Sequence, residues 1–219
     1  LFTQFRKQFR DRGEDVQQRL RAVRTSDSLD RILTALRNPD ADLAPFASAA
    51  AVQARREELD FLELVASDGR IVSSARGPGR DSAESWVTAP VDWKREPAFL
   101  REEQLTGEPV LALVAVETVD SGDKPFYLVG GVRLDDQFLN SLPVSADLRT
   151  SLVRATAADD DAHWPVLREL ADAVHRERNS ITRRIRLEDE SSWTYQGVPL
   201  DGRDGRMLGV LLVGSSPSF

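Results

Sequence analysis

The feature that most constrains the fold is a change of hydrophobic period near residue 60. Up to about residue 37, apolar residues recur at spacings near three, four and seven, which is the pattern of an amphipathic helix. After residue 60 the apolar residues form short extended runs that are separated by turn residues. This order predicts an α+β fold with a long N-terminal helix and antiparallel sheets, because strands and helices do not alternate regularly as in a parallel doubly wound sheet.

The N-terminal helix is expected to be longer than a small domain. Its apolar stripe consists of Phe2, Phe5, Phe9, Val16, Leu20 and Val23. Ser26 or Ser28 is expected to cap a second helical segment, which ends at Asn38-Pro39. At about 1.5 Å per residue the whole segment would extend roughly 50 Å, so part of it is expected to project or to pair with a second copy. If the helix forms a dimer contact, we expect Leu20 and Val23 to lie in it.

The rest of the chain divides into two sets of elements, the second smaller than the first. The first set comprises a helix from about 45 to 60, strands 61–65 and 70–74, a short helix within 92–105, strands 110–116 and 126–132, and a helix from 134 to 142. The second comprises a strand near 151–156, a helix from 164 to 178, and strands near 181–187, 193–198 and 207–213. The predicted domains are therefore a helical stalk and dimer region (1–60), a first unit (61–143) and a smaller second unit (144–219).

The composition excludes several classes of function. With 41% hydrophobic and 30% charged residues, the chain can form a core. Its net charge of -7 makes nucleic acid an unfavourable partner, because such binding requires a basic surface. The absence of cysteine excludes thiolate catalysis, disulfides and zinc–thiolate sites. No run of about 18 apolar residues is present. The chain starts without Met and stops just after an apolar strand, so we expect that it was cut from a longer protein.

Three local patterns could carry chemistry, and each has a simpler structural interpretation. No G-x-S-x-G motif accompanies His163 or His175, and we expect both to have structural roles near helix ends. The acidic run 159–161 lacks the glycine and distal glutamate of a calcium loop. The glycines at 77 and 79 have no strand–helix context or following lysine, so a surface loop is expected there instead of a phosphate site. No catalytic residue, metal site or cofactor is predicted.

In the segment from Leu62 to Ser74, two extended runs flank a turn that contains Asp68 and Gly69. This segment resembles the strand–turn–strand entry that follows the first helix in the Cache (PAS-like) family of extracytoplasmic sensor domains. The segment from Tyr127 to Asp135 is similar to the family's last sheet strand with the following helix. The segment from Gly205 to Val213 is similar to the strand that leads toward a second transmembrane helix. Nearly the whole chain is covered, as a double-Cache layout with a reduced second unit.

This resemblance implies a non-catalytic sensing domain in the periplasmic part of an inner-membrane protein, most often a sensor histidine kinase. It also implies membrane-anchoring helices outside this sequence and a homodimer formed through the N-terminal helix. The amino-acid-binding signature of some double-Cache domains is not recognised, so the resemblance names no ligand. An alternative function is a module without a small ligand that senses a periplasmic partner protein or the state of the membrane.

The candidate ligand-binding residues are Trp93, Arg95, Arg101 and Tyr127. They fall in or beside the segment that covers the open face of the sheet in PAS-like folds. Pockets for small molecules combine aromatic walls with a few polar groups, and arginine can bind a carboxylate through two hydrogen bonds. The alternative is that Trp93 and Tyr127 only fill the core. Trp164 and Trp193 are expected in the core of the second unit.

Overall fold

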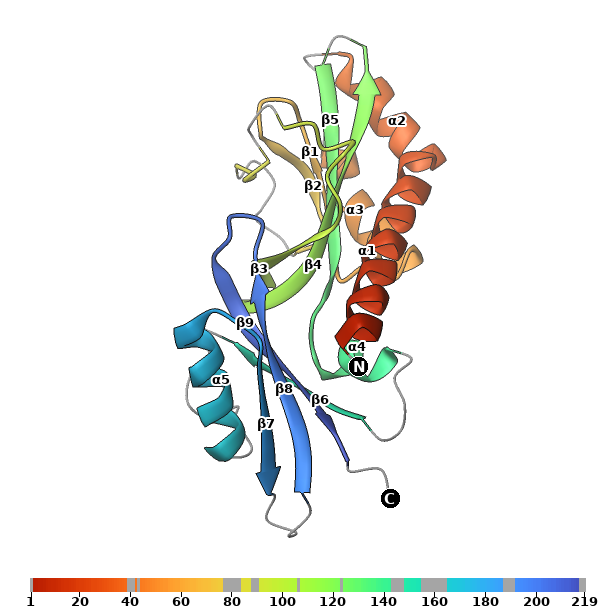
Figure 1. Cartoon of the computed structure of the whole chain (residues 1–219). Helices are drawn as coiled ribbons and strands as arrows, with labels where there is room; N and C mark the ends of the chain where they lie inside the picture. The colour runs from red at the N-terminus through yellow and green to blue at the C-terminus, as the bar shows by residue number, and fades with distance from the viewer. Residues whose placement is uncertain are drawn as a thin grey trace. The chain divides into compact units, whose positions relative to one another are not determined.

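The N-terminal helical pattern folds as separate helices (Figure 1). The computed structural model describes residues 2–38, 42, 44–76, 84–87, 91–105, 107–122, 124–142, 148–154, 165–186 and 192–216. Helix α1 spans Phe2–Arg24 and α2 spans Asp27–Leu36. The predicted cap between them is confirmed, because the side chain of Ser26 accepts a hydrogen bond from the backbone N–H of Leu29.

The third helix is shorter than predicted. A 3-10 turn, η1, covers Ala44–Phe46, and helix α3 covers only Ala49–Arg56. The helix ends where the N–H groups of Glu57 and Leu59 bond to carbonyls of the last turn. Glu58 adopts a positive φ of 53°, a backbone conformation that interrupts the helix before the first strand.

The first sheet has five strands in the order β2-β1-β5-β4-β3. Their bounds are β1 Phe61–Val65, β2 Ile71–Ser74, β3 Phe99–Leu105, β4 Glu108–Ser121 and β5 Lys124–Arg133. The predicted hairpin is confirmed, since β1 and β2 pair antiparallel and Gly69 in their turn has a φ of 87°. The two long apolar strands β4 and β5 also pair antiparallel, as predicted.

Strand pairing separates the residues of this sheet into two faces. Leu62 and Leu64 lie on the face that carries the N-terminal helices, which we call the helix face. Gly130, opposite Leu62, lets α1 approach closely, because a Cβ there would lie 2.9 Å from a methyl carbon of Leu20. Phe61, like every second residue after it in β1, lies on the opposite face, which we call the far face.

The apolar stripe of α1 packs against the helix face. Val16, Leu20 and Val23 are at most 2% exposed, and α1 contacts β4 and β5. The expectation that Leu20 and Val23 form a dimer contact is therefore wrong, because the chain's own sheet already covers them.

The helix predicted within residues 92–105 is also wrong. Residues 93–95 form a turn, and residues 99–105 form the edge strand β3 beside β4. The segment after residue 99 is rich in Arg, Glu, Gln and Leu, which favour helices. Pairing with β4 outweighs that weak preference.

The second sheet has four antiparallel strands in the order β6-β9-β8-β7. They are β6 Leu148–Arg154, β7 Ile181–Arg186, β8 Ser192–Asp201 and β9 Met207–Ser215. Helix α5, Pro165–Glu177, packs on this sheet with a buried face of Leu167, Leu170, Ala171 and Val174. Helix α4, Asp136–Ser141, begins at Asp135, whose side chain accepts from the N–H of Phe138. All of these strands and both helices overlap the predicted elements.

The chain forms two compact units. The first comprises Leu1–Phe99 and Glu103–Arg133, and the second comprises Leu100–Glu102 and Leu134–Phe219. The predicted α+β class, with a smaller second antiparallel sheet, is confirmed. Within the described ranges, no helix has the length and apolar character needed to cross a membrane.

Candidate functional site

The far face of the first sheet carries a buried hydrophobic core. Its buried members are Phe61, Val65, Ile71, Val87, Trp93, Leu105, Ala112, Val114, Val116 and Val129. They come from all five strands of the sheet and from the segment between β2 and β3. This segment therefore covers the far face, as the family resemblance implies.

Three charged side chains are buried on the same face. Arg76, which follows β2, forms ion pairs with Glu63 of β1 and Glu103 of β3. Its Nε lies 3.1 Å from Oε1 of Glu63, and its side chain is only 2% exposed. The side chains of Glu63 and Glu103 are 2% and 5% exposed. The guanidinium carbon of Arg76 also lies 4.3 Å from the ring centroid of Phe61. We call Glu63, Arg76 and Glu103 the buried charged cluster.

Two donor atoms of Arg76 form no hydrogen bond within the described part of the chain. Its Nη1 donates to Glu103, whereas Nη2 has no hydrogen-bond partner and Nε contacts Glu63 only as an ion pair. Ser74 also takes part, since its hydroxyl donates to Oε1 of Glu63 at 3.2 Å. A buried donor without an acceptor costs about 1–3 kcal/mol, and more when it is charged. A ligand oxygen at Nη2 would remove that cost.

An aromatic cluster covers another part of the far-face core. The ring centroids of Trp86 and Trp93 are 5.8 Å apart at an interplanar angle of 76°, and Phe99 lies 5.8 Å from Trp86. Trp93 and Phe99 are stacked, with centroids 6.1 Å apart. Edge-to-face and offset contacts of this kind stabilise a rigid apolar wall.

The structure brings together only part of the predicted site. Trp93 is 3% exposed in the far-face core, and Tyr127 of β5 packs against that core. The Arg95 side chain is 88% exposed and pairs with Asp92, so the structure leaves it at the surface. Arg101 belongs to a stretch of β3 that groups with the second unit. Ligand contact by any of the four residues stays a prediction.

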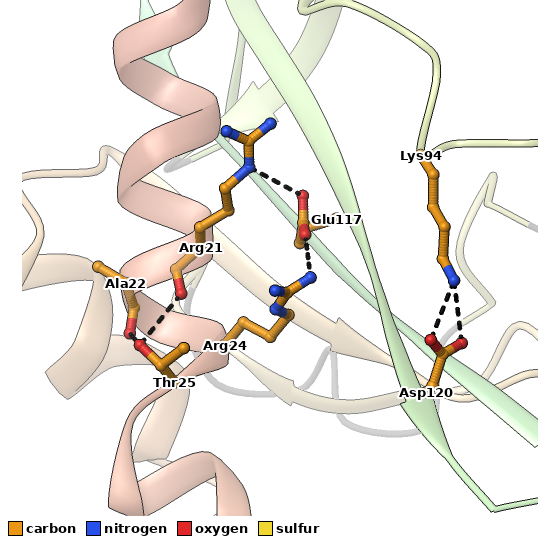
Figure 2. Close-up of polar contacts among 7 residues, drawn as sticks. All are labelled: Arg21, Ala22, Arg24, Thr25, Lys94, Glu117 and Asp120. Atoms are coloured by element: carbon orange, nitrogen blue, oxygen red, sulfur yellow. Dashed lines mark hydrogen bonds and ion pairs between the residues drawn. The ribbon is translucent and has the colours of Figure 1, made fainter.

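Strand β4 holds charged groups on both faces of the sheet (Figure 2). Glu117 points to the helix face, where Arg24 of α1 donates to its Oε1 at 2.7 Å. Three residues later Asp120 accepts from Lys94, at 2.9 Å, in the segment that covers the far face. One strand thus contacts both the N-terminal helix and the covering segment.

A pocket on the helix face is less suited to recognising a polar ligand. It lies where α1 meets α2 and is lined by residues of α1, α2, α3 and the sheet, including Val23, Leu29, Gln53 and Leu64. No charged side chain is among the residues that line it. Shape alone would select its occupant, so the far face is the better candidate site.

The remaining motifs of the sequence contribute no site here. His175 lies in the last turn of α5, as predicted, where a cation would interact favourably with the helix dipole. The glycines at 77 and 79, the acidic run 159–161, His163 and Trp164 lie outside the described residues.

The fold is shared with a known periplasmic domain. The chain is similar to the periplasmic domain of LuxQ from Vibrio cholerae, with 14% identity, a TM-score of 0.54, and coverage of 98% of this chain and 95% of that chain. The chain has the fold of the LuxQ periplasmic domain. The predicted resemblance is confirmed at this level, with two antiparallel units behind a long N-terminal helix.

Two further solved structures match at lower similarity. The sensor domain of the V. cholerae histidine kinase DctB is 7% identical, with a TM-score of 0.48, over 99% of this chain and 96% of that chain. The ligand-binding domain of the Pseudomonas aeruginosa chemoreceptor PctB, in complex with L-Gln, is 17% identical, with a TM-score of 0.38, over 97% and 89%. No family model matches the sequence, and no curated protein is similar to it.

Sequence reasoning missed the buried charged cluster. One signal was present, because Glu63 alternates with Phe61 and Val65 in an apolar strand and must therefore face the same side. A charge at such a position needs a buried partner. The sequence did not identify Arg76 and Glu103 as the partners, since Glu103 lies 27 positions beyond Arg76.

Proposed function

We propose that this chain is the extracytoplasmic sensing domain of a membrane-bound histidine kinase. In this function it is not catalytic. It binds a small ligand on the far face of its first unit and transmits a conformational change through the helices that flank it. The shared fold with the LuxQ periplasmic domain supports the sensing function.

The buried charged cluster is the observation that carries ligand binding. Replacing a buried ion pair with apolar residues is often neutral or stabilising, so a cluster of this kind is weak evidence for a purely structural role. Arg76 offers an unused donor beside the ring of Phe61, on the same far face as the aromatic cluster. A small molecule with a neutral carbonyl oxygen and an apolar part fits these groups, because two carboxylates already balance the charge of Arg76.

The contacts of β4 support transmission to the N-terminal helix. A ligand shifts an equilibrium only through its different affinity for two states. Movement of the covering segment would act on Asp120 through Lys94, while Glu117 of the same strand is bound to Arg24 of α1. Shifts of packed helices by about 1–2 Å are the usual scale of such signals.

The remaining predictions are kept as part of the proposal. The parent protein is anchored in the inner membrane by helices outside this sequence, and the domain lies in the periplasm. The domain forms a homodimer through the N-terminal helix, using the exposed face that carries Arg6, Lys7 and Arg10 instead of the buried stripe. The division into a stalk and two units at residues 60 and 143 also stays a prediction.

Thermal-shift screening of the whole chain against small acids, amines and sugars tests the proposal. A true ligand raises the unfolding temperature, because it binds only the folded state. Glu103→Gln and Tyr127→Phe keep the size of each side chain and should weaken the shift. Arg95→Gln is the matched surface control and should leave it unchanged.

A uniform absence of shifts would contradict ligand binding and favour the alternative, a module that senses a periplasmic partner protein or the membrane. The burial of Trp93 in the core is the observation that favours this alternative. Shifts that survive Glu103→Gln and Tyr127→Phe would place the ligand elsewhere than on the far face.

A further inference from the structure

A row of four cross-paired residues runs over the sheet of the second unit. Arg149 of β6 lies opposite Gly214 of β9, which lies opposite Tyr195 of β8. Tyr195 in turn lies opposite Arg183 of the edge strand β7. Directly opposed residues of antiparallel strands share a face, so two arginines flank one tyrosine on the same side of the sheet.

That side is the face on which α5 packs. Tyr195 belongs to the core that α5 forms with the sheet, and so do Ile181 and Ile185, which alternate with Arg183 in β7. α5 and the four strands β6–β9 appear together in Figure 1. The row therefore places two arginines within this face, between the apolar pairs Ile181–Gly197 and Ile185–Trp193.

Gly214 lets the ring of Tyr195 lean across β9 toward β6. A Cβ on Gly214 would lie 2.5 Å from Cε1 and 2.6 Å from Cζ of that ring, so no larger residue fits beneath it. The outer end of the ring therefore lies over Gly214, and its hydroxyl is directed toward the strand that carries Arg149. Tyr195 is 1% exposed, and within the described residues its hydroxyl has no hydrogen-bond acceptor, while the guanidinium of Arg149 lies near enough to interact with the hydroxyl oxygen.

Arg149 is the charged residue of β6 on the far side of Gly214. Its guanidinium carbon lies 4.3 Å above the ring of Trp193, and the rings of Trp193 and Tyr195 are 6.3 Å apart. Neither Arg149 nor Arg183 forms an ion pair with an acidic side chain in the part of the chain that the structure describes. Arg149 is exposed, so an anion can reach its guanidinium from solvent.

The phenol is held as a hydrogen-bond donor. Burial raises the pKa of Tyr195 above its usual value, and the guanidinium of Arg149 offsets only part of that effect. The hydroxyl therefore keeps its proton at neutral pH. It needs an acceptor, and a guanidinium has none to offer.

We propose that Arg149, Tyr195 and Trp193 form a second binding site, which takes the carboxylate of a small organic acid. One carboxylate oxygen accepts from the hydroxyl of Tyr195 and the other from the guanidinium of Arg149. A short apolar tail lies against the ring of Trp193. Arg183 adds positive charge to the row and needs no direct contact. Charge-assisted hydrogen bonds of this kind are roughly twice as strong as neutral ones.

The apolar tail of an organic acid favours it over a tetrahedral inorganic anion. The ring of Trp193 offers such a tail an apolar contact, which an inorganic ion cannot use. This site is separate from the one proposed in the first unit, so either can be absent without the other.

NMR of the indole groups in the whole chain tests the proposal. The protein has 4 tryptophans, and Trp193→Phe assigns the signal of Trp193. Sodium acetate and sodium propionate, added at constant ionic strength, should move that signal in a saturable way and leave the signals of Trp86 and Trp93 in place. Tyr195→Phe retains the ring and should weaken the affinity by about tenfold or more. Arg149→Gln should abolish saturation.

Arg184→Gln is the charge-matched control, because Arg184 lies on the opposite face of β7 and donates to Ser192. It should leave carboxylate binding unchanged. A signal that does not saturate with either acid would overturn the site. Equal binding of inorganic phosphate would overturn the carboxylate assignment, and an unchanged affinity in Tyr195→Phe would remove the hydroxyl from the site.

Discussion

Nη1 of Arg24 lies 2.7 Å from Oε1 of Glu117 and so joins helix α1 to strand β4 (Figure 2). Arg21 lies farther away, with its Nε 3.9 Å from Oε2 of the same carboxylate. The side chain of Glu117 is 15% exposed, whereas that of Arg24 is 44% exposed. The contact lies at the edge between helix and sheet.

A double-mutant cycle with Arg24→Gln and Glu117→Gln should give a coupling energy of about 0.5–1 kcal/mol in urea unfolding. A partly exposed ion pair gains little beyond this range. The coupling should fall when the salt concentration is raised, because salt screens charges near the surface. A coupling that salt does not change would show that the contact is not electrostatic.

The pair Lys94 and Asp120 should be weaker than the pair on the helix face. Their side chains are 57% and 74% exposed, and water competes for both charges. A cycle with Lys94→Gln and Asp120→Asn should give about 0–0.5 kcal/mol. A coupling energy larger than that of Arg24 and Glu117 would contradict the expectation that the more exposed ion pair is the weaker one.

Arg76→Met should lower the free energy of unfolding by about 3–5 kcal/mol, because it removes the buried cation that pairs with both Glu63 and Glu103. Adding Glu63→Gln and Glu103→Gln in the same chain should restore a large part of the loss, since no charge of the cluster remains. Chemical unfolding measures all of these variants. Arg55→Met, on the exposed side of α3, should change stability by less than about 0.5 kcal/mol.

Leu20→Ala should cost about 2–5 kcal/mol of stability and leave the oligomeric state unchanged. Leu20 is fully buried against the chain's own sheet, so its removal leaves a cavity. Urea unfolding and sedimentation measure the two properties separately. Gln18→Ala, on the exposed side of α1, is the control. Dissociation of a dimer by Leu20→Ala at full stability would argue against this packing.

The pH dependence of stability should report the burial of Tyr195. Burial raises its pKa in the folded state above the usual value of 10.0, so the unfolded state loses the proton first as pH rises. The contribution of Tyr195 is therefore complete below pH 10 and is lost as pH rises through the folded-state pKa. Tyr195→Phe should lose less stability than the unchanged protein above pH 10. Tyrosinate absorbance follows the titration, since the chain has 2 tyrosines.

The sequence predicted the turns and helix caps that form through contacts between neighbouring residues. The turn at Gly69 and the cap at Ser26 depend on neighbouring residues, and both were predicted from the sequence. Strand β3 was not, because residues 99–105 favour a helix by composition and become a strand only beside β4. The range of the third helix was too long for a related reason, since Glu58 ends it through a backbone conformation that composition does not reveal.

The burial of the far face by the segment before the long strands was predicted, whereas its charged groups were not. The aromatic residues Trp93 and Tyr127 were found because the segment before the long strands covers the sheet in PAS-like folds. The charged groups were not predicted from the sequence. Arg76 contacts Glu63 and Glu103 only when the five strands are arranged in the sheet.

The sequence by itself determined that this chain has a helical N-terminus, antiparallel sheets and a sensor-like order of elements, because hydrophobic period and turn residues act over a few positions. Only the tertiary structure decided what the long helix covers and which charges meet. Leu20 fits α1 onto Gly130, and Arg76 joins strands β1 and β3. Both contacts join residues that are far apart in the chain. Patterns of neighbouring residues therefore do not predict them.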